Sequence, residues 1–128
     1  MTDDSRGMAV RRDVLGDEYV DRALARRDEF TAPFQDFITR YAWGEVWDRP
    51  NLDRRTRSCV TVALLAALRA HEELAIHIRG ALRNGVTPDE LREVLLQTAI
   101  YAGVPAANSA FAVAQPILAE PSGKGNAG

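Results

Sequence analysis

The feature that most constrains the fold is an apolar run from Cys59 to Leu68, CVTVALLAAL. It lies in a helix that we predict over Asp53 to Arg69. The run is apolar nearly all round, so most sides of this helix must be buried. A chain of 128 residues is small for covering such a helix alone. Packing at a subunit interface would solve the problem, and burial in the middle of a monomeric bundle is the alternative.

The rest of the chain also shows helical spacing. Apolar residues recur three and four apart in five further segments. One segment begins at Asp17, and another runs from Thr31 into Trp47. The other three cover Glu72 to Asn84, Thr87 to Gly103 and Ala106 to Glu120. Thr87, Pro88 and Glu90 form a helix-start signal, and Gly85 is a typical C-terminal cap. No strand pair is convincing, so the sequence predicts an all-α, compact five- or six-helix bundle.

The length and charge of the chain limit its organisation and partners. We expect a single domain over residues 1–128, with a globular part at about 8–120 and disordered tails at 1–7 and 121–128. Sixteen basic and 18 acidic residues give a net charge of −2, which argues against a nucleic-acid partner. No apolar run approaches the roughly 18 to 20 residues of a membrane span. The N-terminus is acidic and polar, unlike a secretory signal, so a cytoplasmic protein is expected.

The cysteine and histidine content excludes several kinds of site. One cysteine, Cys59, cannot form an internal disulfide, a CxxC redox pair or a cysteine-based zinc site. The two histidines, His71 and His77, lie six residues apart, whereas a zinc-protease helix needs a spacing of four. We therefore expect no metal site.

Glu73 and His77 form the first candidate catalytic pair. They lie four residues apart and are therefore neighbours on one helix face, at the edge of a stripe that contains Leu74 and Ile78. A carboxylate beside an imidazole at the edge of a buried face can raise the histidine pKa towards neutrality or above, as a general acid requires. The alternative is a solvated helix pair.

Basic and aromatic residues form two further clusters. Arg54, Arg57 and Ser58 share one helix face, and two guanidiniums near a helix N-terminus could bind an anion. The alternative is a solvated first turn. Tyr41, Trp43 and Trp47 concentrate aromatic surface, which belongs to a core or interface or to the wall of a pocket.

Five stretches together resemble the gamma-carboxymuconolactone decarboxylase family, within the alkylhydroperoxidase D-like superfamily. The resemblance covers about residues 8 to 118. It is carried by Val14-Leu-Gly-Asp, Thr39-Arg-Tyr-Ala-Trp-Gly-Glu-Val-Trp, Arg54-Arg-Thr-Arg-Ser, Asn84-Gly-Val-Thr and Glu93-Val-Leu-Leu-Gln-Thr-Ala-Ile-Tyr-Ala-Gly-Val-Pro-Ala-Ala-Asn. The sequence departs from the family pattern at Ala102 and Ala112, where a cysteine and a histidine are usual.

The resemblance implies a fold and an activity. The expected fold is an all-helical homo-oligomer, described for the decarboxylases as a hexamer. The expected activity is cofactor-independent conversion of 4-carboxymuconolactone, a dicarboxylate lactone, to 3-oxoadipate enol-lactone in protocatechuate catabolism by the β-ketoadipate pathway. His77 is expected to donate a proton or to stabilise an oxyanion, and Glu73 to orient it. The expected substrate-binding residues are Arg54 and Arg57 for the carboxylates and Trp43 and Tyr41 for the ring.

Three other functions are weighed against this one. Peroxidase-like members of the superfamily carry Cys-x-x-Cys-x-x-x-His; with their histidine placed on His77, the cysteine positions hold Ala70 and Glu73, which excludes thiol peroxidase chemistry. A related lyase or hydrolase on another lactone or oxo acid remains open. So does a non-catalytic helical assembly module.

Overall fold

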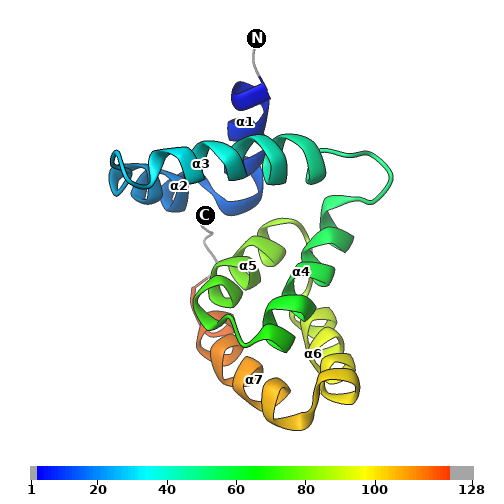
Figure 1. Ribbon diagram of the computed structural model, residues 1–128. Helices are drawn as coiled ribbons and strands as arrows, with labels where there is room; N and C mark the ends of the chain where they lie inside the picture. The colour runs from blue at the N-terminus through cyan, green and yellow to red at the C-terminus, as the bar shows by residue number, and fades with distance from the viewer. Residues whose placement is uncertain (1–2, 122–128) are drawn as a thin grey trace. The chain divides into compact units, whose positions relative to one another are not determined.

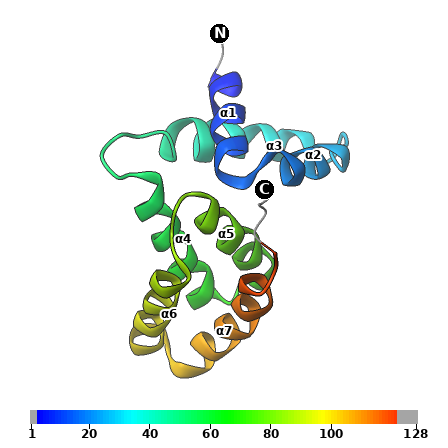
Figure 2. The ribbon, with the colours of Figure 1, turned by 180° about the vertical axis from the view of Figure 1, so that it is seen from behind.

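The computed structural model describes residues 3–121, and the chain divides into two compact units with a boundary between Arg57 and Ser58. Figures 1 and 2 show only helices and their connections across this range, which confirms the all-α prediction for the described residues. The sequence did not indicate the division into units, and the single domain stays a prediction.

The first unit holds three α-helices and one π-helix. They are α1 (Asp3–Leu15), α2 (Asp17–Ala25), α3 (Ala32–Ile38) and the π-helix η1 (Thr39–Val46). α4 (Arg54–Leu68) begins in the first unit and continues into the second, which also contains α5 (His71–Arg83), α6 (Pro88–Ala102) and α7 (Val104–Leu118). Over residues 3–121 this makes seven α-helices, so the expected count of five or six is wrong.

The helix that sequence reasoning missed is α1. Residues 3–7 were expected in a disordered tail but form its first turns. Its buried positions are Gly7, Val10, Arg11, Val14 and Leu15. A glycine and an arginine interrupt the apolar pattern there, so the helical spacing is hidden. Residues 1–2 and 122–128 of the expected tails lie outside the described residues.

A close backbone contact joins α1 to η1. A Cβ atom at Gly7 would clash with the backbone carbonyl of Thr39 and would lie 3.2 Å from the amide nitrogen of Gly44. These two helices therefore approach each other more closely than any side chain at position 7 allows. The absence of a side chain at Gly7 permits this contact between α1 and η1.

η1 replaces the regular helix expected up to Trp47. The amide of Trp47 donates to the carbonyl of Ala42, five residues earlier, at 2.8 Å. Trp43 is 6% exposed and stacks on Trp47, with ring centroids 5.2 Å apart. π-helical turns are rare and often occur at functional sites.

The second unit has a continuous apolar core. α5 and α6 both contact α7. The predicted caps are confirmed: Thr87 and Glu90 form a reciprocal capping box, and Gly85, at φ 95°, follows the last turn of α5. The largest fully buried side chains of this unit are Leu74, Ile78, Leu91, Leu95 and Val62.

The apolar helix α4 is only partly covered within the single chain. Val62 and Ala66 are fully buried, whereas Val60, Leu64 and Leu68 are 47%, 57% and 74% exposed. The expectation that this helix is buried on most sides is therefore not met by its own chain. One face of α4 stays apolar and open.

The packing at Gly7 generates a stability prediction. On helix propensity alone, Gly7→Ala would stabilise α1 by about 1 kcal/mol. The clash with Thr39 reverses this gain, and overpacking of this kind costs about 1–3 kcal/mol. We expect a lower melting temperature for Gly7→Ala in thermal unfolding. Ala9→Gln, at an exposed position of the same helix, is the control and should change stability by less than about 0.5 kcal/mol. A Gly7→Ala protein as stable as wild type would show that the two helices are not held this close.

Candidate active site

His77 lies beside the buried stripe of α5. Leu74, Ile78 and Ala81 are fully buried and belong to the core of the second unit. His77 follows Leu74 by three residues and is partly buried, while Glu73, one turn earlier, is exposed. The imidazole therefore sits at the margin of the core with its carboxylate neighbour on the solvent side. This is the arrangement that the spacing predicts.

The pKa of His77 differs from the expected value. Burial lowers the pKa of His77 from 6.5 to about 4, and the negative charge of Glu73 only partly offsets this effect. The expectation that Glu73 raises this pKa to neutrality or above is therefore wrong. Desolvation disfavours the imidazolium more strongly than one exposed carboxylate can stabilise it. At neutral pH His77 is an uncharged imidazole.

A neutral imidazole suits one of the two roles considered for His77. It carries one N–H donor and one acceptor nitrogen. A donor fixed in a partly dry site can stabilise an oxygen on which negative charge develops. A neutral imidazole is a weak acid, so it is poorly suited to donate a proton to carbon.

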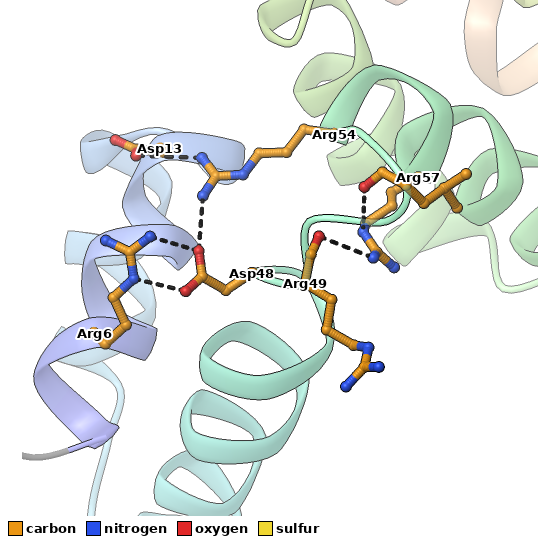
Figure 3. Close-up of polar contacts among 7 residues, drawn as sticks. Arg6, Asp13, Asp48, Arg49, Arg54 and Arg57 are labelled. Atoms are coloured by element: carbon orange, nitrogen blue, oxygen red, sulfur yellow. Dashed lines mark hydrogen bonds and ion pairs between the residues drawn. The ribbon is translucent and has the colours of Figure 1, made fainter.

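The arginines predicted to bind an anion are engaged within the first unit (Figure 3). Nη1 of Arg54 lies 3.3 Å from Asp13 and Nη2 lies 3.6 Å from Asp48. Asp48 also accepts a 2.8 Å hydrogen bond from Nε of Arg6, and this contact lowers its pKa. Arg54 is thus part of an ion-pair cluster that joins α1 to the segment before α4.

Arg57 has different partners from Arg54. Its guanidinium donates to the backbone carbonyls of Leu52 at 3.0 Å and Arg49 at 3.2 Å. Figure 3 shows these contacts holding the loop that precedes α4. Ser58, expected on the same face, is 1% exposed and accepts a 2.9 Å hydrogen bond from Asn84. The structure therefore does not bring Arg54, Arg57 and Ser58 together on one ligand.

The aromatic residues predicted to wall a pocket lie in different surroundings. Trp43 is buried in the core of the first unit, whereas Tyr41 is 48% exposed. The Tyr41 ring packs against Phe37 at 4.9 Å, and the guanidinium of Arg40 lies 5.4 Å from its centroid. All these residues belong to the first unit, while His77 and Glu73 belong to the second.

A buried arginine was not predicted. Arg11 of α1 is 3% exposed, and its Nη1 lies 3.5 Å from Oγ1 of Thr39. Burial lowers its pKa. The position of Arg11 between Val10 and Val14 on one helix face is the sequence signal from which its burial could have been predicted.

Residues 3–121 contain neither a metal-binding cluster nor a membrane-spanning helix. No group of three or more histidine, cysteine, aspartate or glutamate side chains in that range could hold a metal ion. No helix there is long and apolar enough to cross a membrane. A hollow of about 400 Å³ does lie between α6 and α7, lined among others by Leu91, Leu95 and Phe111, but neither His77 nor Glu73 lines it.

Comparison with known proteins gives several extensive matches. Residues 32–116 match the model of the carboxymuconolactone decarboxylase family. The chain is 48% identical to 4-carboxymuconolactone decarboxylase of Acinetobacter baylyi, over 92% of this chain and 90% of that protein. It is 47% identical to nitrosuccinic acid decarboxylase of Metarhizium robertsii, over 93% and 83%. A 4-carboxymuconolactone decarboxylase of Pseudomonas putida is 54% identical over 30% of this chain and 81% of its own length.

The lowered pKa of His77 generates a prediction for stability against pH. Between pH 6.5 and about 4 the unfolded chain binds a proton at this residue that the folded chain does not. Stability should therefore fall as the pH drops through this window. We expect the melting temperature of His77→Gln to fall less than that of wild type between pH 7 and pH 4.5. His71→Gln, the exposed histidine of the same helix, is the matched control. Equal slopes for His77→Gln and wild type would contradict the burial effect.

Proposed function

The chain belongs to the carboxymuconolactone decarboxylase family, and from this premise we propose that it converts 4-carboxymuconolactone to 3-oxoadipate enol-lactone. The observation that carries the proposal is 48% identity to a 4-carboxymuconolactone decarboxylase over nearly the full length of both chains. The reaction class is that of a carboxy-lyase. The pathway is protocatechuate catabolism.

The chemistry of the substrate explains what such a protein has to supply. The carboxylate that leaves is bonded to a ring carbon next to the carbon–carbon double bond, which is conjugated with the lactone carbonyl. When CO₂ departs, its bonding electron pair moves through the double bond onto the carbonyl oxygen and forms a furan-like dienolate. A proton added at the α carbon then gives the enol-lactone. The ring is its own electron sink, so the protein has to bind a dianion, stabilise the dienolate oxygen and deliver one proton.

His77 is the proposed oxyanion donor. Its uncharged imidazole retains an N–H at neutral pH, and the partly buried position strengthens a hydrogen bond to developing charge. Glu73 is the proposed positioning residue, which orients the imidazole from the solvent side. The proton that reaches the α carbon comes from a stronger acid than His77.

The proposed substrate-binding residues are Arg54, Arg57, Trp43 and Tyr41. Arg54 would exchange a contact with Asp13 or Asp48 for a substrate carboxylate. Arg57 uses its guanidinium on two carbonyls, which are neutral acceptors, and a guanidinium has five N–H donors. Tyr41, half exposed, is better placed than buried Trp43 to contact a ligand ring.

A second substrate is favoured by the comparison with nitrosuccinic acid decarboxylase, which is almost as similar. 2-Nitrosuccinate is also a dicarboxylate, and loss of CO₂ beside its nitro group leaves a nitronate with negative charge on oxygen. Both reactions thus need dianion binding, an oxyanion donor and one proton to carbon. Decarboxylation of a nitro dicarboxylate is the alternative function.

Self-association is a further part of the proposal. The second unit exposes two apolar sets, Val60, Leu64 and Leu68 on α4, and Leu96, Ile100, Tyr101 and Val104 around the end of α6. Large apolar patches on soluble proteins usually mark interaction sites. A homo-oligomer, expected to be a hexamer, would cover them.

The catalytic proposal predicts a graded loss of turnover. We expect wild type to turn over 4-carboxymuconolactone with a higher kcat/KM than 2-nitrosuccinate, measured by CO₂ release. His77→Gln should lower kcat by about 10²-fold or more, as loss of an oxyanion donor does elsewhere. Glu73→Gln should lower it less, and His71→Gln should leave it unchanged. A folded His77→Gln enzyme with full turnover would end the assignment of His77. A preference for 2-nitrosuccinate would select the alternative function.

The assembly proposal predicts the effect of a charge on the open face of α4. Leu64→Glu should reduce the mass measured by light scattering after size-exclusion chromatography, because the interface would have to bury the carboxylate. Gln115→Glu introduces the same charge at an exposed polar position of α7 and is the control. A wild-type protein that runs as a monomer would refute the proposal.

A further inference from the structure

Among residues 5–121, whose burial the structure describes, Arg11 is the one charged residue that is buried, at 3% exposure. Its single hydrogen bond, to Oγ1 of Thr39, is long at 3.5 Å. Its Nε is buried and has no hydrogen-bond partner. A guanidinium stays charged in proteins, so the first unit encloses a positive charge that is poorly compensated.

A second unsatisfied group lies on α3, the helix that continues into η1. Oε1 of Gln35 is also buried without a partner. Gln35 precedes Thr39 by four residues, one turn earlier along the run from α3 into η1. The amide oxygen and nitrogen of a glutamine can exchange places by rotation, so Gln35 can present a donor where the structure has the oxygen. Arg11, Thr39 and Gln35 then offer N–H and O–H donors from two adjacent helices.

Other arginines of the first unit show how unusual Arg11 is. Arg6 pairs with Asp48, Arg12 with Asp17 and Asp21, and Arg54 with Asp13 and Asp48. All of these are more exposed than Arg11. Of these four arginines, Arg11 is the most buried and has no carboxylate partner among the described contacts.

Water could satisfy each unpaired atom, because Nε donates and Oε1 accepts. It would leave the positive charge uncompensated, and a buried unpaired charge is costly. An anion compensates the charge and accepts several donors at once. A carboxylate suits the planar guanidinium, with which it forms two parallel hydrogen bonds.

We propose that Arg11, assisted by Thr39 and Gln35, binds one carboxylate of the substrate. This inference rests on the proposed function, which requires a dianion to be bound. The inference adds Arg11 to the proposed substrate-binding residues. Arg54 already pairs with Asp13 and Asp48, whereas Arg11 has no aspartate partner among the described contacts.

Binding without catalysis gives the first test. Succinate, a small dicarboxylate, should raise the melting temperature of the full-length wild-type protein, since a ligand that binds only the folded state stabilises it. Arg11→Met should abolish the shift. Arg22→Gln is the matched control, because Arg22 is an exposed arginine of the same unit that pairs only with Glu18 among the described contacts. A succinate shift that Arg11→Met retains would overturn the inference, as would no shift in wild type.

Steady-state kinetics with 4-carboxymuconolactone give the second test. Arg11→Met and Arg11→Lys should raise KM at least about tenfold, the loss expected for hydrogen bonds to a charged group. Arg22→Gln should keep the wild-type KM. A folded Arg11→Met enzyme with wild-type KM would overturn the inference and leave the proposed function standing. If the wild-type protein does not turn over 4-carboxymuconolactone but shows a succinate shift that depends on Arg11, the proposed function is refuted and the proposed carboxylate site at Arg11 stands.

Gln35→Glu keeps the test decisive if Arg11→Met does not fold. It places a carboxylate of the protein itself on the side of the α3–η1 run that holds the unsatisfied oxygen. This internal anion should raise the melting temperature, reduce the succinate shift and raise KM. Wild-type values of all three would overturn the inference. A change in oligomeric mass of an Arg11 variant with unchanged KM would also overturn it, because the anion would then come from a second copy.

Discussion

The burial of Leu74, Ile78 and Ala81 on α5 is the constraint on which the candidate site depends. These side chains are anchored in the core shared with α6 and α7, so the orientation of α5 is determined by packing. His77 has to follow this orientation and sits at the core margin, where it loses much of its hydration. Desolvation then sets the protonation state of His77, and the charge of Glu73 only partly offsets the lowering of its pKa. The chemistry proposed for His77 is therefore a consequence of core packing.

The first unit depends on a comparable constraint of its own. The contact between Gly7 and the backbone of Thr39 lets α1 lie directly against η1. The same contact region holds Arg11 beside Thr39, away from water. Close packing therefore produces both the stability of this unit and its unmatched positive charge. In both units, a group that would be ordinary on the surface acquires a special property because it is buried.

Local signals in the sequence were sufficient for much of the fold. Thr87 and Glu90 determine a helix start through their own hydrogen bonds, and Gly85 ends α5 through its backbone freedom, so both could be predicted. Helix α1 could not be predicted, because Gly7 and Arg11 are core positions through packing and do not follow an apolar periodicity. The π-helical pitch of η1 has no compositional signature.

The site was predicted less well than the fold. The spacing of Glu73 and His77 predicts that they are neighbours, and the structure agrees, but spacing carries no information on the depth of burial. The partners of Arg54 are Asp13 and Asp48, of which Asp13 is 41 residues away. Such partners follow only from the tertiary structure. Arg11 was missed because an arginine in an apolar stripe reads as an interruption of the stripe.

Release of CO₂ from a conjugated dicarboxylate, followed by protonation of the resulting dienolate at the α carbon, is the reaction assigned to this chain. The most direct measurement is the reaction of the purified, chelator-dialysed protein with 4-carboxymuconolactone in D₂O, followed by NMR. We expect one CO₂ for each enol-lactone formed, one deuterium at the α carbon and a rate well above the spontaneous one. Unchanged substrate, or a ring-opened product that retains both carboxylates, would contradict it.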